Sequence, residues 1–367
     1  MIRRLLRAAA SATVPVPEFP KVAAPPLRRD LGDFHGFAGH PGSRGYHRDA
    51  VAMVNIAQLI HRLGGLAQKQ QLVSRGARDL DLTQAVRDGS AVRARQGWYT
   101  TVDEAEPRVR AARVGGRLTG ISAIQDWGGW VLANHDLHVS VPRNSARLRN
   151  QWNRRRPLTF ARGVHVHWDA PELSERGSAW SVSAVDALIR VVLDEELETA
   201  VAALDWAVHS GLLDEIDFER VFLGLPKSKS WVRGWVDGAC ESLPESLTRT
   251  RLRLAGYTVT IQVPLGPQRI DMVIDGTVGL EIDGREFHAA TFEKDHLKAI
   301  DITIAGFHAM AVSANMVFTN WSHFLHAVEL AVASHAPPSF GNSGTPAIRA
   351  SGAPQQRGRY GRWRGSS

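Results

Sequence analysis

Residues 269–284 read RIDMVIDGTVGLEIDG. Their β-branched and apolar residues predict two strands, one over QRIDMVIDG and the next over VGLEIDG. Side chains alternate between the faces of a strand, so Glu281 and Asp283 share one face, and Asp271 lies on the neighbouring strand. The pattern therefore predicts three carboxylates that converge at one point of a sheet.

Converging carboxylates need a cation between them, because burying like charges together is costly. Oxygen ligands of this kind suit Mg²⁺ or Mn²⁺. We therefore expect Asp271, Glu281 and Asp283 to be metal ligands, in a site where the metal activates water and stabilises charge growing on a phosphate. The alternative is structural, with Asp271 as an acid at a strand edge and residues 281–284 as a turn.

The surrounding segment, residues 240–336, predicts a helix, three strands, a helix, a strand and a final helix. The helices are expected over SLTRTRLRLAG, FEKDHLKAIDITIAG and WSHFLHAVELAV, and the outer strands over YTVTIQVP and FHAMAVS. This α-β-β-β-α-β order resembles the restriction-endonuclease-like PD-(D/E)XK nucleases, in particular a domain-of-unknown-function family related to very-short-patch-repair endonucleases. The matching pieces, in order, are Glu245, Gln262-Val263-Pro264, Arg269-Ile270-Asp271, Leu280-Glu281-Ile282-Asp283-Gly284 and His288.

The resemblance implies a metal-dependent endonuclease with the three acids among its catalytic residues. His288 is the candidate general base or phosphate contact, because a neutral imidazole accepts a proton near neutral pH. Glu245 is expected to hold the metal ligands in position without contacting the metal itself. Gln262 is expected to orient water or a phosphate oxygen.

The sequence departs from the resembled families at three places. Many of these enzymes carry a lysine two positions after the second acid, where this chain has Asp283, although the resembled family commonly has an acid there too. The following helix usually reads Asp-x-x-Arg-Asp and here supplies Asp295, Lys298 and Ala299, and the arginine at the end of the next strand is Ala311. Two charged positions of the family have thus become alanine. Either Asp301 and His308 compensate for this loss, or this copy binds DNA without cutting it well.

Residues 53–102 predict three short helices, at 53–62, 68–75 and 81–88, and an alternating stretch at 91–101 with a turn at Gly97. Three helices followed by a hairpin indicate a winged helix. The third helix, with Asp81 as its candidate N-cap, is expected to offer its outer face to DNA, and the hairpin is expected to add basic side chains. The candidate DNA-binding residues are Thr83, Gln84 and Arg87 on the helix and Arg93 and Arg95 on the wing.

The segments GGLAQKQQLVSRG and LTQAVRDGSAVRARQGWYT resemble the N-terminal domain of AbiEi-type antitoxins from abortive-infection systems. That resemblance implies a second hypothesis, an antitoxin-like transcriptional repressor whose carboxy-terminal domain is a weak or inactive remnant, with a cognate toxin as partner. A winged helix can also dock a protein instead of DNA. The first hypothesis remains a DNA-binding protein with a Mg²⁺-dependent endonuclease domain.

Residues 103–239 predict a mixed α/β middle domain, with strands at 137–141 and 164–168 and helices at 120–126, 183–193 and 198–209. His165 and His167 share one face of a strand, with Asp169 beyond them, so a metal site is conceivable, but a solvated face is the favoured interpretation. The basic block from Arg143 to Arg162 holds seven arginines, no acid, and Trp152. It fits either phosphate and base contacts or a solvated loop.

The chain carries a formal net charge of +7, but the charge sits mostly in its ends. Residues 1–52 and 337–367 contribute +4 and +5, and their Pro, Gly and Arg-rich composition predicts disordered tails. Translation from Met53 is an alternative. A single cysteine, Cys240, and the absence of a long apolar run favour a cytoplasmic protein with no membrane partner. The predicted class is α/β, α+β overall.

Overall fold

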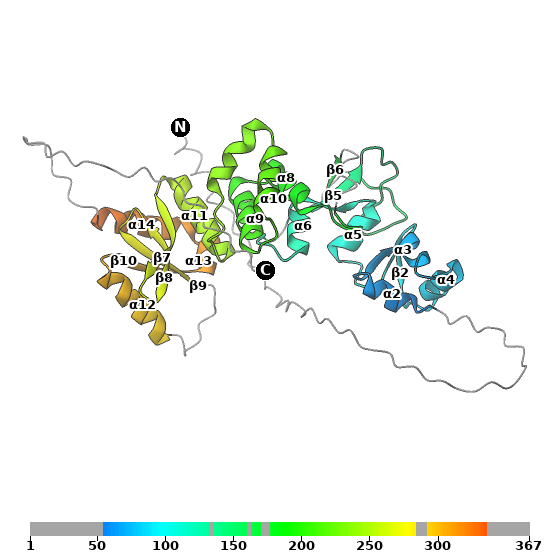
Figure 1. The fold of residues 1–367 in the computed structure, drawn as a ribbon, viewed down its shortest axis with the longest axis horizontal. Coiled ribbons are helices and arrows are strands. Elements are labelled where there is room, and N and C mark those ends of the chain that lie inside the picture. Colours follow the sequence, from blue (N-terminus) through cyan, green and yellow to red (C-terminus); the bar gives the residue numbers. More distant parts are fainter. Residues whose placement is uncertain (1–53, 133–134, 160–162, 170–176, 284–291, 336–367) are drawn as a thin grey trace, which may run out of the picture.

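A computed structural model describes residues 54–132, 135–159, 163–169, 177–283 and 292–335. It is a mixed α/β structure with three small sheets, consistent with the α+β prediction. Figure 1 shows three successive groups of helices and strands along the chain. Both predicted tails, Met53 and His288 lie outside the described residues. None of the described helices has both the length and the apolar character of a membrane span.

The first group consists of short helices around a three-stranded sheet. Its helices are α2 (Ile56–Arg62), α3 (Lys69–Val73) and α4 (Asp79–Arg87), and its strands are β1 (Leu66–Gln68), β2 (Val92–Arg95) and β3 (Trp98–Thr100), in the order β1-β3-β2. The turn between β2 and β3 falls at Gly97, whose φ of 80° suits glycine. The apolar faces of the three helices meet in one core, which includes Ile60, Leu72 and Leu82.

Three sequence predictions need correction in this group. The first helix begins at Ile56, with Asn55 as its N-cap, three residues later than predicted. β1 was not expected, because three residues are too few to show a period. The third helix begins at Asp79, earlier than predicted, and Asp81 lies in its first turn instead of at the N-cap. The Asp81 carboxylate accepts hydrogen bonds from the backbone N–H of Arg78 (3.0 Å) and from the Arg78 guanidinium (2.8 Å), so it caps the helix from inside the first turn.

The middle group holds the largest apolar core. Its strands β4 (Arg117–Leu118), β5 (Leu137–Pro142) and β6 (Val164–Asp169) form a sheet in that order, with β5 and β6 parallel. Its α-helices are α5 (Pro107–Val114), α6 (Gly120–Asp126), α8 (Ala184–Asp194), α9 (Leu197–His209) and α10 (Glu215–Leu223), followed by the 3-10 helix η1 (Lys227–Trp235). Each predicted strand and helix of this segment begins and ends within about one residue of its predicted bounds. The elements α5, β4, α10 and η1 were not predicted.

The last group shows the predicted elements in the predicted order, with one further helix, α13, that was not predicted. Helix α11 (Leu243–Ala255) precedes β7 (Val259–Leu265), β8 (Gln268–Ile274) and β9 (Val278–Asp283), and then come α12 (Phe292–Ile304), β10 (His308–Ser313), α13 (Ala314–Thr319) and α14 (Trp321–His335). The sheet order is β10-β9-β8-β7, and only β9 and β10 are parallel. Leu247, Met272 and Phe324 share one core cluster, and Ile302 of α12 belongs to another, with Ile270.

A buried ion pair joins the last two groups. Asp205 of α9 is fully buried, and its carboxylate accepts hydrogen bonds from the Arg249 guanidinium (2.8 Å), the Ser246 hydroxyl (2.6 Å) and the Asp237 backbone N–H (2.7 Å). Ala202 of α9 also lies in the core of the last group. The predicted boundary between residues 239 and 240 therefore separates two segments that pack continuously against each other.

We expect Arg249→Leu to lower the free energy of unfolding by about 3–5 kcal/mol, because it leaves a buried carboxylate without its cation. Arg220→Ala is the matched control, since Arg220 pairs with Asp217 at an exposed site and such pairs contribute at most about 1 kcal/mol. Urea unfolding measures both. Equal losses in the two variants would show that the buried pair does not hold the groups together.

Candidate active site and nucleic-acid interface

Helix α12 lies unusually close to strand β9, and glycine makes this possible. A Cβ atom on Gly279 would come 2.6 Å from Cγ2 of Ile302, so no larger residue fits there without a shift. Lys298 precedes Ile302 by four residues and shares its face of the helix. Glu281 follows Gly279 by two residues and shares its face of the strand. The same close approach therefore places Lys298 over Glu281.

The two acids and this lysine form one cluster. The Lys298 ammonium contacts the Glu281 carboxylate and lies 3.9 Å from Oδ1 of Asp271. Asp271 accepts a hydrogen bond at Oδ2 from the backbone N–H of Ile282 (2.7 Å), and its own N–H donates to Oε1 of Glu281 (3.4 Å). The backbone pairing of β8 with β9 ends at Met272 and Leu280. Beyond that pair, the side chains of Asp271 and Glu281 make the hydrogen bonds between the two strands.

The cluster has two carboxyl groups and one ammonium, and burial disfavours the charged form of both acids. Burial raises the pKa of Glu281 to about 7, although the Lys298 hydrogen bond lowers it. Burial also raises the pKa of Asp271, against the lowering effect of the Ile282 hydrogen bond and of Lys298. Two half-buried carboxylates with one ammonium would therefore gain from a further cation.

Glu245 and Gln262 lie beside Asp271: the Glu245 carboxyl is close enough to be affected by the Asp271 charge, and Gln262 stands opposite Asp271 between two register pairs of β7 and β8. Glu245 is buried in the first turn of α11, where it accepts hydrogen bonds from the Ser242 hydroxyl (2.7 Å) and the Glu241 N–H (2.9 Å). Gln262 donates from Nε2 to Oε2 of Glu245 (3.4 Å). Its φ of 53° is a left-handed conformation that costs a residue with a side chain about 1 kcal/mol or more. This strain lies in the strand segment next to Asp271.

The remaining predicted residues of this site lie at or beyond the edge of the cluster. Asp283 is exposed at the end of β9, close enough to Asp271 for its charge to raise the pKa of that carboxyl. Asp301 is exposed on α12. His308 pairs with Val278 at the other end of β9 from Glu281, and its ring centre lies 4.5 Å from that of His335, so compensation by these two residues stays a prediction. Ala311 pairs with Glu281 in the β9–β10 register, so the missing arginine would have stood next to the site.

The sequence interpretation missed the contribution of Lys298. It treated Lys298 as a departure from the expected helix motif, whereas the structure places this ammonium on the two acids. One signal for it was available, because a lysine was absent from its usual place on the strand and the next helix carries two lysines, Lys294 and Lys298.

A second cluster with metal-ligand chemistry lies in the middle group. The donor atoms of His138, His167 and Asp194 all lie within 4.8 Å of one another, so these residues could hold a metal ion. Burial lowers the pKa of His138 to about 3 and that of His167 to about 4, so both imidazoles are neutral. The predicted solvated face is correct for His165, which is 57% exposed at its side chain, and wrong for His167. His138 and Asp194 were not considered.

Four of the five candidate DNA-binding residues are exposed. They are Thr83, Gln84 and Arg87 on α4 and Arg93 on β2. Arg95 is half-buried instead, and its guanidinium donates to the backbone oxygen of Val114 (2.9 Å), which ties β2 to α5. The prediction that Arg95 faces DNA is therefore wrong. The β2–β3 register shifts between Arg93 and Arg95, so regular alternation does not carry from one to the other, and the Arg95 guanidinium is held on α5.

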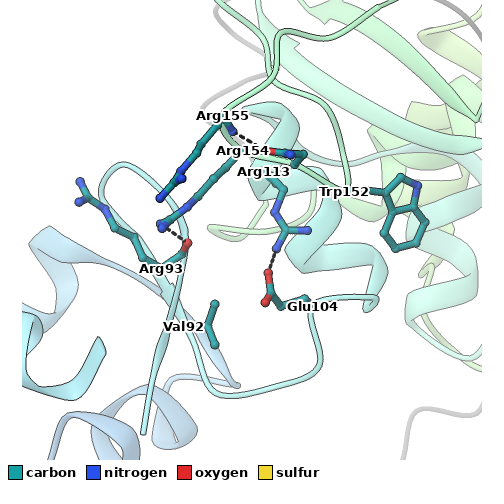
Figure 2. A pocket seen from close by; sticks show the side chains of 8 residues that line it. Val92, Arg93, Glu104, Arg113, Trp152, Arg154 and Arg155 are labelled. Atoms are coloured by element: carbon teal, nitrogen blue, oxygen red, sulfur yellow. Dashed lines mark hydrogen bonds and ion pairs between the residues drawn. The ribbon is translucent and has the colours of Figure 1, made fainter. Parts of the chain in front are cut away.

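The basic block packs against the tip of β2 and forms a pocket with it (Figure 2). The pocket has a volume of about 340 Å³ and is lined by Val92, Arg93, Glu104, Arg113, Trp152, Asn153, Arg154 and Arg155. Arg154 donates to the backbone oxygen of Arg93 (2.6 Å). Arg113 is paired with Glu104, so the charge surplus comes from Arg93, Arg154 and Arg155.

Trp152 stands at the edge of this pocket and is only partly available for stacking. The Arg110 guanidinium lies 4.3 Å from the centre of its ring, so one face of the indole is covered. The side chain is nevertheless 58% exposed. The basic block is therefore neither a free loop nor a bare stacking platform, but a surface built jointly with β2.

In a chelating buffer, the stability contributed by the Glu281 carboxyl should fall as pH rises from about 4.5 to about 7. Its folded-state pKa lies above its unfolded value, so the folded protein binds the extra proton and loses that advantage once the group ionises. Glu281→Gln should remove this part of the pH dependence and gain stability over wild type as pH rises. Parallel pH profiles of the two proteins in thermal melts would contradict a buried, proton-binding Glu281.

No protein-family model matches the chain, and no curated protein matches it. The function therefore rests on the geometry of the cluster of Asp271, Glu281 and Lys298 and of the basic surface built by β2 and the basic block.

Proposed function

We propose that the chain binds DNA and hydrolyses phosphodiester bonds with Mg²⁺ or Mn²⁺ at Asp271 and Glu281. The observation that carries this proposal is the cluster of two half-buried carboxylates and the Lys298 ammonium at the point where β8 and β9 separate. Two acids on adjacent strands with a nearby lysine are the functional groups of the nucleases that the sequence resembles. The element order of residues 243–335 supports a restriction-endonuclease-like fold.

The residues present fit Mg²⁺. This ion is commonly held by one or two carboxylates, with water and substrate phosphate completing its shell. The excess negative charge at Asp271 and Glu281 supplies the reason for a cation to bind there. A bound Mg²⁺ would lower the pKa of water and stabilise charge on a phosphate. Asp283, exposed at the end of β9, is our candidate for a third oxygen ligand.

The protein's own residues would position the substrate. Lys298 lies between the acids and is the group able to donate to a phosphate oxygen when a cation takes over the neutralisation of Glu281. Gln262 would present its amide beside Asp271, held there by Glu245. His288, outside the described residues, stays a candidate general base on the resemblance alone.

DNA would be held by the first group and the basic block. The three helices and the β2–β3 hairpin support a winged helix, with the outer face of α4 in the major groove. Arg93, Arg154 and Arg155 would contact phosphates beside it. Two segments distant in sequence thereby present one cationic edge.

The alternative hypothesis is a repressor of the AbiEi antitoxin type, with a cognate toxin as partner and a carboxy-terminal domain that is catalytically weak or inactive. One observation favours it. Lys298 already contacts Glu281 and approaches Asp271, so an internal cation occupies the place between the acids. In this alternative, DNA binding through α4 and the basic edge is retained and cleavage is absent.

Cleavage separates the two hypotheses. With Mn²⁺ or Mg²⁺, wild type should cut duplex or single-stranded DNA, and chelation should abolish cutting. Asp271→Ala and Lys298→Met should each lower the rate by about 100-fold or more, since each removes a group that stabilises the transition state. Asp301→Ala, an exposed acid on the same helix, is the control and should leave the rate unchanged. Absence of cutting by wild type, with DNA binding intact, would support the repressor.

The triple variant Arg93→Ala, Arg154→Ala, Arg155→Ala should weaken duplex binding and flatten its salt dependence. Each lost phosphate contact lowers the slope of log affinity against log salt by about 0.9. The matched control removes the same charge elsewhere, with Arg220, Lys227 and Lys229 changed to alanine. Fluorescence anisotropy at several salt concentrations measures both. Equal weakening in the two triple variants would mean that net charge, not this edge, drives binding.

A further inference from the structure

We propose that His138, His167 and Asp194 bind Zn²⁺ at a site in the middle group, separate from the acids of the carboxy-terminal sheet. The three residues come from three elements. His138 lies on β5, His167 on the parallel neighbour β6, and Asp194 is the last residue of α8. The register pairs His138 with His165 and Ser140 with His167, so the three histidines share one face of the sheet.

The spacing of the donor atoms fits a tetrahedral ion. Nε2 of His167 lies 3.3 Å from Nδ1 of His138, and Oδ2 of Asp194 lies 3.7 Å from His138 Nδ1 and 3.6 Å from His167 Nε2. Ligands about 2.0–2.1 Å from zinc in a tetrahedron are about 3.3 Å apart. Octahedral ligands at about the same distance from their ion are only about 2.9 Å apart. The observed spacing therefore favours a tetrahedral over an octahedral ion.

Hydrogen bonding alone does not account for the cluster. The His138–His167 contact is one hydrogen bond, but the Asp194 oxygen is 3.6–3.7 Å from both nitrogens, beyond hydrogen-bond distance. A cation shared by the three atoms explains why all three point at one place without closing on one another. Two imidazoles and one carboxylate suit Zn²⁺, whereas Mg²⁺ prefers a shell of oxygens.

Neighbouring charges orient two of the three ligands. Oε1 of Glu195 lies 3.8 Å from Nε2 of His138, which favours a proton on that nitrogen and leaves Nδ1 with its lone pair. The Arg190 guanidinium lies 3.8 Å from Oδ1 of Asp194, on the oxygen that does not face the histidines. Oδ2 is thereby left for the ion.

A glycine keeps the site open. Gly120 has a φ of 53°, and a Cβ atom there would come 3.2 Å from Nδ1 of His138, the proposed ligand atom. The side chains of His138, His167 and Asp194 are 6%, 12% and 24% exposed, so an ion can enter from the Asp194 side. Three protein ligands leave a fourth tetrahedral position, which we assign to water. This is the arrangement of zinc sites that bind a further molecule, not of closed structural sites.

The test uses the full chain, freed of metal by chelation, with Zn²⁺ alone as ligand. Calorimetric titration should give one Zn²⁺ per chain at this site, and Co²⁺ substitution should give the intense visible absorption of a tetrahedral ion. His167→Gln and Asp194→Asn should each weaken Zn²⁺ binding by about 100-fold and remove the rise in melting temperature that Zn²⁺ causes. Circular dichroism of the metal-free variants shows whether they fold.

Two controls make the result specific. His165→Gln changes an exposed histidine on the same strand and should keep the Zn²⁺ affinity within about threefold, since it supplies no ligand. Asp271→Ala disrupts the other candidate metal site and should leave the Zn²⁺ affinity unchanged, whether or not DNA cleavage is lost. No Zn²⁺ binding by wild type, undiminished binding by a folded His167→Gln, or an octahedral Co²⁺ spectrum would each overturn the proposal.

Discussion

The buried ion pair of Asp205 and Arg249 is the constraint on which the arrangement of the carboxy-terminal half depends. A carboxylate in this position is tolerated because the guanidinium, a hydroxyl and a backbone N–H satisfy it together. The pair fixes α11 against α9, and a second pair between Arg251 and Glu198 links the same two helices. Since α11 also carries Glu245, the orientation of the candidate active site is set from the neighbouring group of helices.

The two candidate metal sites differ in the cation that each would select. Asp271 and Glu281 offer oxygens only, already share a lysine, and carry charge that burial makes costly. His138, His167 and Asp194 offer two neutral nitrogens and one oxygen at tetrahedral spacing. A hard ion with mobile waters suits the first and Zn²⁺ the second. The two proposed sites would thus not compete for the same ion.

Positive charge is concentrated in local patches of the structure. The body of the chain is slightly acidic, so a nucleic acid would respond to patches and not to an overall field. The pocket between β2 and the basic block shows how such a patch is made. Arg154 binds the backbone of Arg93, sixty-one residues earlier in the chain, and the two side chains reach the same edge (Figure 2).

Much of the secondary structure was predictable from the sequence, since periodicity reports how each element divides its own residues between a buried and an exposed face. The strands that carry Asp271 and Glu281 and the element order of the last group were predicted on this basis. The pairing of those two acids followed as well, because adjacent strands joined by a short turn have little freedom.

Which element covers each face was decided only by the tertiary structure. Periodicity placed Lys298 on a helix but not over Glu281, a position that depends on the close approach of α12 at Gly279. It placed Arg95 on a strand but not against Val114. It placed His167 on a strand face, but His138 and Asp194 come from other elements: α8 packs on α6, and α6 packs on β5. A sequence period describes one element at a time, whereas these contacts join elements far apart in the chain.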